Sequence, residues 1–377
     1  MKPLRIAFLS AGRFTHIGPY IDFFKSRGHD VFLIKYDYSE KDYGVPAYDV
    51  SFGARGDRGG SKWKYLLAGI RIRHILDQIN PDILHGHYIT SAGVIALMSG
   101  FRPYVLTAHG SDVIGALQKR LWRFVLPRVL AKAALVNPVS EDLAARLAAI
   151  GVPREKICTA TLGVDTGRFA FAPRQADGRP WRLLCTRTLG RVYDPMTIVD
   201  ACGSLKDKGV DFELTFAAGG PKTEELRQAV MQKRLDGYVR FLGGYDNSAL
   251  PELLHQHDVF VSASLWDGTS ISLLEAMAAG IFPVVSRIAA NTAWLQEGLT
   301  ATMFNCGDAA GLADAVLRAI KDVSLRRSAV EANRRLVVEK ADRTMNMQTL
   351  ERKYYEVLGL HFNGMAGNAE LAGRLLF

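Results

Sequence analysis

Short apolar runs alternate with helical patterns along most of the chain. In the first half, runs typical of buried strands occupy residues 4–10, 31–37, 82–87, 104–110 and 135–140. Between these runs, apolar residues recur at helical spacing and predict helices at 19–27, 62–79, 89–99 and 116–132. Strands that alternate with helices are typical of parallel sheets whose crossover helices cover both faces.

The alternation stops at residues 166–181, where prolines, glycine and mixed charges are typical of a linker. It then restarts, with strand-like runs at 181–188, 212–219, 238–244, 259–265 and 281–287. The chain has 377 residues, and one hydrophobic core rarely serves more than about 250–300. We therefore predict two doubly wound, Rossmann-like α/β domains, at 1–168 and 169–344, with helices of residues 345–377 packed back on the first.

Ligands of open parallel sheets bind at the carboxyl ends of the strands. Two such sheets in one chain predict a central cleft between the domains. The residues that directly follow each strand are therefore the candidates for binding and catalysis.

The stretch LWDGTSISLLEAMAAG (265–280) follows one predicted strand and opens a helix of small residues. The unpaired amides at a helix N-terminus suit a diphosphate, and Gly268 allows the backbone to approach a ligand. Asp267, Thr269 and Ser270 lie where a ligand would lie, and the Asp267 carboxylate can accept hydrogen bonds from sugar hydroxyls. Gly280 fits a left-handed helix stop.

A purely structural interpretation of the same stretch also fits. The sequence Ser272-Leu-Leu-Glu275 is a capping box, in which Glu275 would only start the helix. Asp267 would then be a turn residue.

Polar residues follow several other predicted strands. Arg187 comes after WRLLCT, and its guanidinium suits phosphate, although a surface salt bridge is an alternative. His109, in TAHGSD, also stands at a strand end and is a candidate catalytic residue. In LHGHY, His85 and His87 either line an acceptor site or simply pack.

We predict no metal site, because no third ligand at recognisable spacing accompanies the two histidines of LHGHY. Gly12 follows the first strand, where a loop can approach donor phosphates or an acceptor. Its spacing from Gly18 does not match the dinucleotide fingerprint, which argues against a nicotinamide cofactor. Arg13 and His16 are acceptor-side candidates in the same loop.

The net charge of +9 and the pI of about 9.3 favour an anionic partner, although solubility alone can explain them. The predicted helix at 116–132 carries five cations and no acid, interleaved with apolar and aromatic residues. This composition suits an anionic membrane surface, or an ordinary helix with one face in solvent. No nucleic-acid-binding motif accompanies the charge.

No apolar run is long enough to span a membrane, and the N-terminus is typical of a buried strand rather than of a secretory signal. The four cysteines have no metal-like or redox spacing. We expect a cytoplasmic protein, with a peripheral position on the inner face of the membrane as a further hypothesis.

The segment SASLWDGTSISLLEAMAAGIFPVVS resembles the signature of the family 4 (group 1) glycosyltransferases, which have the GT-B fold. The segments LGVDTGRF, THIGPYIDFFKSRGHDVFLI, PDILHGHYITSAG and TAHGSDV resemble the family in order and spacing. The resemblance covers residues 4–345 and implies a retaining transfer of a sugar from a nucleoside diphosphate to an acceptor hydroxyl, without a metal ion or other cofactor.

The resemblance also implies roles for single residues. Glu275 would hold the ribose hydroxyls, Asp267 the donor sugar, and Arg187 the diphosphate, while His109 would lie beside the donor sugar. The backbone amides of Thr269, Ser270 and Ile271 would lie near the sugar and phosphates.

The sequence departs from the family at two places. Asp267 stands where glutamate is usual, and Tyr193-Asp194 occupies the usual lysine-glycine position. Arg191 is a candidate to supply the missing charge. A glycan or lipid-linked acceptor in surface polysaccharide or glycolipid assembly fits the family, with a nucleotide-sugar epimerase of the same fold or a non-catalytic relative as alternatives.

Overall fold

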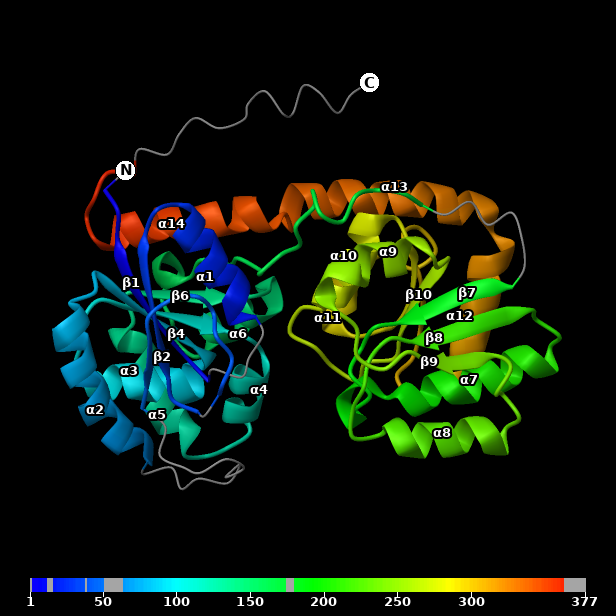
Figure 1. Ribbon diagram of the computed structural model, residues 1–377, viewed down its shortest axis with the longest axis horizontal. Helices are drawn as coiled ribbons and strands as arrows, with labels where there is room; N and C mark the ends of the chain where they lie inside the picture. The colour runs from blue at the N-terminus through cyan, green and yellow to red at the C-terminus, as the bar shows by residue number, and fades with distance from the viewer. Residues whose placement is uncertain (1, 12–15, 38, 51–63, 174–179, 363–377) are drawn as a thin grey trace. The chain divides into compact units, whose positions relative to one another are not determined.

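The computed structural model describes residues 2–11, 16–37, 39–50, 64–173 and 180–362 (Figure 1). The chain divides into two compact units, one made of residues 1–162 and 344–377 and the other of residues 163–343. Each unit contains one six-stranded sheet, which confirms the predicted pair of doubly wound domains. The division points lie close to the predicted ones, 168 and 344.

The sheet of the first unit is entirely parallel, with the strand order β3-β2-β1-β4-β5-β6. Its strands are β1 (Arg5–Ser10), β2 (Asp30–Lys35), β3 (Ala47–Asp49), β4 (Ile83–His87), β5 (Tyr104–Ala108) and β6 (Leu135–Pro138). Its helices are α1 (Ile17–Ser26), α2 (Lys64–Ile79), α3 (Gly93–Ser99), α4 (Ser111–Leu117), α5 (Trp122–Lys132), α6 (Glu141–Ala149) and α14 (Arg343–Val357).

Alternate residues of β1 enter the two cores of this unit, as the two-residue repeat of a strand requires. Ala7 and Leu9 pack with residues of α2, α3, α4, α5 and α6. Ile6 and Phe8 face the opposite side and pack with α1 and α14. The last helix therefore completes the first unit, and Figure 1 shows it beside α1.

A buried ion pair fixes α14 on the first unit. The Glu351 carboxylate is fully buried and accepts hydrogen bonds from Arg27 Nε (3.2 Å) and from His29 Nε2 (2.8 Å). His29 Nδ1 accepts the backbone N–H of Leu4 at 3.0 Å, so the proton of a neutral ring lies on Nε2 and faces the carboxylate. The three side chains join α14 to α1 and to the loop before β2.

The sheet of the second unit is also parallel, with the order β12-β11-β10-β7-β8-β9. Its strands are β7 (Trp181–Cys185), β8 (Phe212–Phe216), β9 (Val239–Phe241), β10 (Val259–Ser262), β11 (Phe282–Ser286) and β12 (Thr302–Phe304). Its helices are α7 (Pro195–Asp207), α8 (Thr223–Gln232), α9 (Leu250–His255), α10 (Ile271–Ala279), α11 (Ala289–Thr292), α12 (Ala309–Lys321) and α13 (Val323–Lys340).

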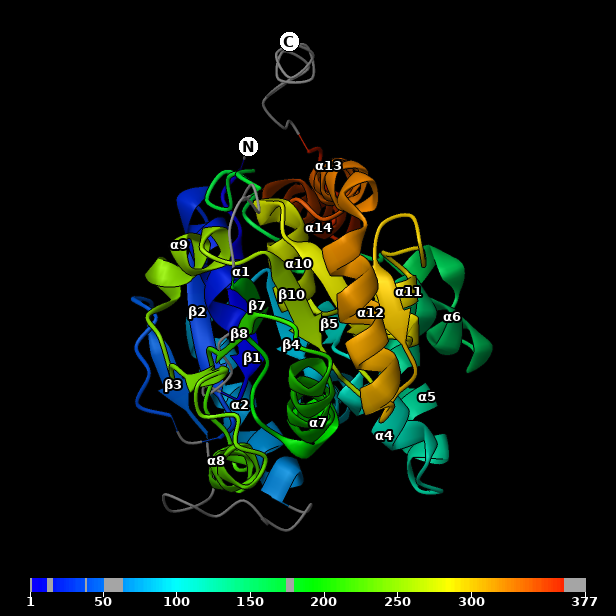
Figure 2. The same cartoon turned by 90° about the vertical axis from the view of Figure 1, so that its right-hand side faces the viewer.

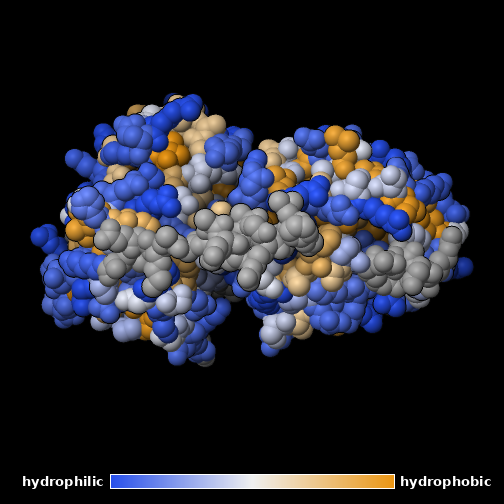
Figure 3. Space-filling view, turned by 90° about the horizontal axis from the view of Figure 1, so that it is seen from above, coloured by the Kyte–Doolittle hydropathy of each residue, from blue (hydrophilic) through white to orange (hydrophobic). Residues whose placement is uncertain are grey.

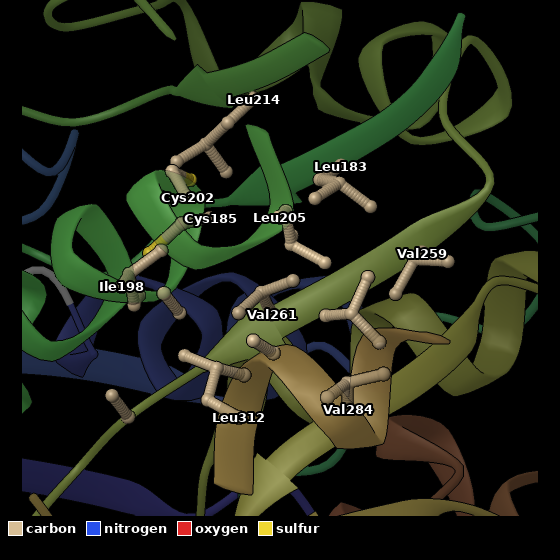
Figure 4. Close-up of a cluster of buried hydrophobic side chains, with 14 of the residues drawn as sticks. Leu183, Cys185, Ile198, Cys202, Leu205, Leu214, Val259, Val261, Val284 and Leu312 are labelled. Carbon is tan, nitrogen blue, oxygen red and sulfur yellow. The ribbon is translucent and has the colours of Figure 1, made fainter. Parts of the chain in front are cut away.

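Two apolar cores again cover the faces of this sheet. On one face, Leu183 and Val261 pack with Ile198 of α7 and Leu312 of α12 (Figure 4). Figure 2 shows α12 lying along this side of β11. On the other face, Leu184 packs among residues of α9, α10 and α13. Both faces are buried, as the continuous apolar runs predicted.

Each sheet has one point at which the chain reverses its direction of winding. In the first unit the connections leave β1 and β4 toward opposite edges of the sheet, and in the second they leave β7 and β10 in the same way. Loops that follow the two strands at such a point diverge and leave room for a ligand. These four strand ends are therefore where the site residues are expected.

The structure corrects three local predictions. The edge strands β3 and β12, each of three residues, lie outside the predicted runs. The predicted basic helix at 116–132 is interrupted, because α4 ends at Leu117 and α5 begins at Trp122. The helix predicted at 89–99 is α-helical only from Gly93, because residues 88–92 form a π-helical turn.

Exposed apolar residues form small patches among hydrophilic ones on the face seen in Figure 3. Among the helices that the structure describes, none combines the length and the apolar character needed to cross a membrane.

Replacement of Glu351 tests the buried ion pair. Glu351→Ala leaves Arg27 and His29 without their partner, so we expect the free energy of unfolding of the first unit to fall by about 3–5 kcal/mol. The control is Glu356→Ala on the same helix, which removes a half-exposed pair with Lys353 and should cost less than about 1 kcal/mol. Urea unfolding followed by circular dichroism compares the variants, and equal losses would contradict a special role for Glu351.

Candidate functional site

Arg187 and Asp267 meet at the point in the second sheet where the winding reverses. Arg187 follows β7, and Asp267 lies in the loop after β10. Arg187 Nη2 is 2.5 Å from Asp267 Oδ2, and the two side chains are only 12% and 18% exposed. The structure therefore brings together two residues that the sequence proposed separately.

Three further contacts fix the guanidinium of Arg187. Its Nη1 donates to Ser272 Oγ at 2.9 Å and to Ser270 Oγ at 3.2 Å. The ring of Tyr193 lies beneath it, 4.2 Å from the guanidinium carbon, in a cation–π contact. Arg187 Nε is buried and has no hydrogen-bond partner among the described residues. The side chain is thus oriented at the N-terminus of α10 with its Nε donor available.

The N-terminus of α10 is capped by Ser270, whose Oγ accepts the N–H of Leu273 at 3.3 Å. The alternative interpretation, a capping box of Ser272 and Glu275, is therefore wrong, because the N-cap is Ser270, two residues earlier, and the helix begins at Ile271. Gly268 N donates to Asp267 Oδ1 at 2.8 Å and orients that carboxylate. The helix ends at Gly280, whose φ of +87° confirms the predicted left-handed stop.

Glu275 lies one turn inside α10 and is half-buried. Among the described residues, none donates a hydrogen bond to its carboxylate. Burial raises the pKa of Glu275 from its ordinary value of 4.5 to about 7, and the nearby charges of Arg343, Arg168 and Arg187 oppose this shift. A partly buried carboxylate that receives no hydrogen bond from the described residues can accept hydrogen bonds from a ligand.

The structure also shows the contacts of the residues at which the sequence departs from the family. Tyr193 stacks on Arg187, while Asp194 adopts a left-handed conformation and its Oδ2 accepts a hydrogen bond from Thr197 Oγ1 at the start of α7 (2.6 Å). Arg191 is exposed, and its guanidinium makes no hydrogen bond or ion pair with the described residues. Its role as a second donor-binding cation stays a prediction.

In the first unit, three histidines meet at the corresponding reversal of winding. His16 lies at the start of α1, His87 ends β4, and His109 follows β5. The Nδ1 of His87 is 3.1 Å from Nε2 of His109, and the ring centroids of His16 and His109 are 4.3 Å apart. The acceptor-side candidates His16 and His87 are thus neighbours of the catalytic candidate His109.

Burial controls the charge of this cluster. It lowers the pKa of His16 from 6.5 to about 4 and the pKa values of His87 and His109 well below 6.5. Repulsion between the rings lowers the values for His87 and His109 further. The three imidazoles are therefore neutral at physiological pH.

The backbone beside the cluster is strained. Tyr88 has a φ of +76°, which is uncommon for a large side chain, and it opens the π-helical turn of residues 88–92. Its ring centroid lies 4.6 Å from that of His109. Such strain persists where the surrounding structure enforces it, most often at functional sites.

His85 is placed differently from the other histidines, and its proposed acceptor-side role is corrected. The residue is fully buried, with Nδ1 2.5 Å from Tyr354 Oη and Nε2 2.7 Å from Thr107 Oγ1. Because both ring nitrogens have partners inside the core, His85 has a packing role. Gly12 and Arg13 lie outside the described residues.

Sequence reasoning missed several neighbours of these sites. Ser272 and Tyr193 contact Arg187, and the charges of Arg168 and Arg343 act on Glu275. Arg168 is in a segment that resembled the family, so that segment was the available signal. Nothing in the local sequence marked Arg343 or the stacking of Tyr193.

The fold has close counterparts among solved structures. The structure of Alr3699/HepE from Anabaena in complex with UDP-glucose superimposes with a TM-score of 0.76, at 15% identity, over 94% of this chain and 100% of that one. The two parallel six-stranded sheets and this likeness define a GT-B fold.

Sequence comparison identifies the family. The model of the family described as "Glycosyl transferases group 1" matches residues 182–322. The model of the family described as "Glycosyl transferase 4-like" matches residues 5–138. The chain therefore belongs to the group 1, family 4-like glycosyltransferases, as its motifs indicated.

Two curated relatives illustrate the range of this similarity. WcaL of Escherichia coli (strain K12), by its name a colanic acid biosynthesis glycosyltransferase, is 28% identical over 242 residues, 61% of this chain and 59% of that protein. The match thus spans less than two thirds of the length of WcaL. The phosphatidyl-myo-inositol mannosyltransferase of Mycolicibacterium smegmatis is 29% identical over 306 residues, 78% of this chain and 76% of that protein.

The pH dependence of stability tests the environment of Glu275. Because its pKa is raised on folding, the folded protein keeps a proton that the unfolded chain has lost between pH 4.5 and about 7. The contribution of Glu275 to stability therefore falls as the pH rises through this window. Glu275→Gln removes this loss, so we expect it to stabilise the ligand-free protein at pH 8 by on the order of 1–3 kcal/mol.

Urea unfolding of wild type and Glu275→Gln at pH 4.5, 6 and 8 measures this difference. The two curves of stability against pH should approach each other at pH 4.5 and separate toward pH 8. Parallel curves would show that the carboxylate is solvated in the folded protein.

Proposed function

We propose that this protein is a retaining glycosyltransferase that moves a sugar from a nucleoside-diphosphate sugar to an acceptor hydroxyl. We place the reaction in the assembly of a surface polysaccharide or a glycolipid. The observation that carries the proposal is Arg187, held against the N-terminus of α10 by Asp267, Ser272 and Tyr193. A fixed guanidinium beside the amides of a helix N-terminus is a site for a diphosphate.

In this proposal the donor lies along the start of α10. Arg187 and the amides near Ser270 bind the diphosphate, and Glu275 accepts hydrogen bonds from the ribose hydroxyls. Asp267 reaches either the donor sugar or only Arg187, since one of its oxygens already accepts from that guanidinium. Ribose hydroxyls would give the Glu275 carboxylate the hydrogen bonds that it otherwise lacks.

The chemistry would follow from stabilisation of the leaving group. As the bond between the sugar and the diphosphate breaks, negative charge grows on the phosphate, and Arg187 and the α10 dipole are already oriented toward it. We propose that the acceptor attacks the same face of the sugar and that the leaving phosphate oxygen takes its proton. His109 would act beside the sugar as a neutral hydrogen-bonding group.

This mechanism does not require a bound metal ion, since Arg187 and the helix supply the positive charge. The names of related proteins support a nucleotide-sugar donor and a polysaccharide or glycolipid acceptor. UDP-glucose is bound in the Anabaena structure, WcaL is named for colanic acid, and the mycobacterial relative is named for a phosphatidylinositol acceptor.

A donor screen tests the assignment directly. Nucleoside diphosphates and their common sugars are titrated while the melting temperature is followed, since a ligand that binds only the folded protein raises it. We expect one base and one sugar to stand out. No shift with any of them would favour a non-catalytic relative, and turnover of the donor without acceptor to an epimeric sugar would favour an epimerase.

Arg187→Ala tests the diphosphate site with the selected donor. We expect a loss of about 100-fold or more in kcat/KM, because a group oriented toward developing charge is worth about 3–4 kcal/mol. The control is Arg327→Ala, an exposed arginine of α13 in the same unit, which should retain activity within about twofold. A loss below about threefold for Arg187→Ala would refute its role.

The region of α5 is the proposed membrane contact of this enzyme. Leu121 is 56% exposed and Phe124 is 68% exposed, and Arg120 and Arg123 are exposed beside them. Apolar side chains among cations fit the boundary of an anionic bilayer. This position would bring the enzyme to a lipid-linked acceptor on the inner face of the membrane.

Vesicle sedimentation tests this contact. The double variant Leu121→Ser, Phe124→Ser should bind vesicles containing phosphatidylglycerol at least about 10-fold more weakly, because each apolar side chain contributes about 1.5–3 kcal/mol when fully buried. Met231→Ser, at a 61% exposed position in the second unit, is the control and should bind like wild type. Equal binding of all three proteins would exclude this surface.

A further inference from the structure

The three neighbouring histidines of the first unit form a cluster with the geometry of a metal site. One ring nitrogen of each of His16, His87 and His109 can be chosen so that all three atoms lie within 4.8 Å of one another. The sequence suggested no third ligand for His87, because His16 is distant in the chain and reaches the cluster only through the order of the strands. No spacing in the sequence could have indicated His16 as this third residue.

The hydrogen-bonding capacity of the His87 ring is only partly used by the protein itself. A neutral imidazole has one N–H donor and one lone pair. His87 Nδ1 and His109 Nε2 share a single hydrogen bond at 3.1 Å, and His87 Nε2 is buried without a hydrogen-bond partner among the described residues. A cation at the centre of the cluster would accept a lone pair from each ring, whereas no proton can bridge all three.

We propose that His16, His87 and His109 bind one divalent transition-metal ion, for which Zn²⁺ is the best fit. Imidazole nitrogens suit Zn²⁺, Co²⁺, Ni²⁺ and Cu²⁺, while Mg²⁺ and Ca²⁺ prefer oxygen ligands. Three protein nitrogens with an open fourth position are a known coordination of Zn²⁺.

The distances require little rearrangement. Tetrahedral ligands at about 2.0–2.1 Å from Zn²⁺ stand about 3.3–3.4 Å from each other. The nitrogens of His87 and His109, at 3.1 Å, already approach this spacing. The backbone of both is fixed at the ends of paired strands, so the remaining adjustment falls on the His16 side chain at the start of α1.

The ion would act as an inhibitor of the enzyme. This consequence rests on the proposed function, in which the neutral ring of His109 acts beside the donor sugar. A metal bound to His109 would occupy its nitrogen and place a positive charge in the site. The transfer reaction would then be blocked by micromolar Zn²⁺ and restored by a chelator.

Cobalt provides a direct probe of the site that does not depend on activity. The untagged full-length chain with Cys306→Ser, which removes the exposed thiol, is titrated with Co²⁺ while visible absorption is recorded. We expect one equivalent of Co²⁺ with the intense bands of a tetrahedral complex, displaced by one equivalent of Zn²⁺. His16→Ala should weaken binding by about 100-fold or more, since it removes a ligand.

The control is His74→Ala, which removes an exposed histidine of α2 and should bind Co²⁺ like the parent. His87→Ala should match His16→Ala, and circular dichroism verifies that each variant folds. If His87→Ala unfolds the protein because His87 is buried, loss of the absorption bands in His16→Ala is sufficient to support the site. Absence of tetrahedral bands in the parent, or equal binding by the parent and His16→Ala, would overturn the site.

Zinc inhibition then separates this inference from the proposed function. The transfer assay is run with the parent and with His16→Ala over the same Zn²⁺ series. Stoichiometric inhibition of the parent, shifted at least about 100-fold in His16→Ala, supports both claims. If Zn²⁺ binds but transfer continues, the metal site stands and the role of His109 is refuted.

Discussion

Parallel strands end at one edge of a sheet, and this constraint brings together candidate residues that lie far apart in the chain. In each unit the winding reverses between two central strands, β1 and β4 in the first and β7 and β10 in the second. The loops after these strands diverge, so polar side chains can meet without burying backbone groups that lack partners. The same constraint produces a histidine cluster in one unit and an ion pair in the other.

The two sites differ because their residues respond oppositely to burial. A buried imidazole loses its charge easily, and the first unit therefore has a neutral, hydrogen-bonding cluster around His109. A guanidinium keeps its charge, so Arg187 can be held in the second unit only with a counter-ion, two hydroxyls and an aromatic ring. In the proposed function, this division would give one unit a cationic surface for phosphate and the other a neutral surface for sugar hydroxyls.

Much of this arrangement could be predicted from the sequence, and the limits have physical causes. Long apolar runs identified the central strands because both faces are buried, whereas β3 and β12 are too short for any periodicity. Arg187, His109 and Asp267 were found because each follows a recognisable strand. The meeting of His16 with His109 depends on strand order, which local pattern does not contain. The cap of α10 was misplaced because several hydroxyl residues in succession can each begin a helix.

The departures from the family at the donor site are connected with each other. Asp267 in place of glutamate has a shorter reach, and its carboxylate is bound to Arg187 at 2.5 Å. Tyr193, near the usual lysine, adds no charge but covers one face of the same guanidinium. A lysine at this position would add a second positive charge and strengthen the attraction for phosphate. Its flexible side chain would, however, lose entropy on binding. In the proposed donor complex, Arg187 is oriented in advance from three sides, so less entropy would be lost when a phosphate binds, and this preorganisation would offset part of the missing charge.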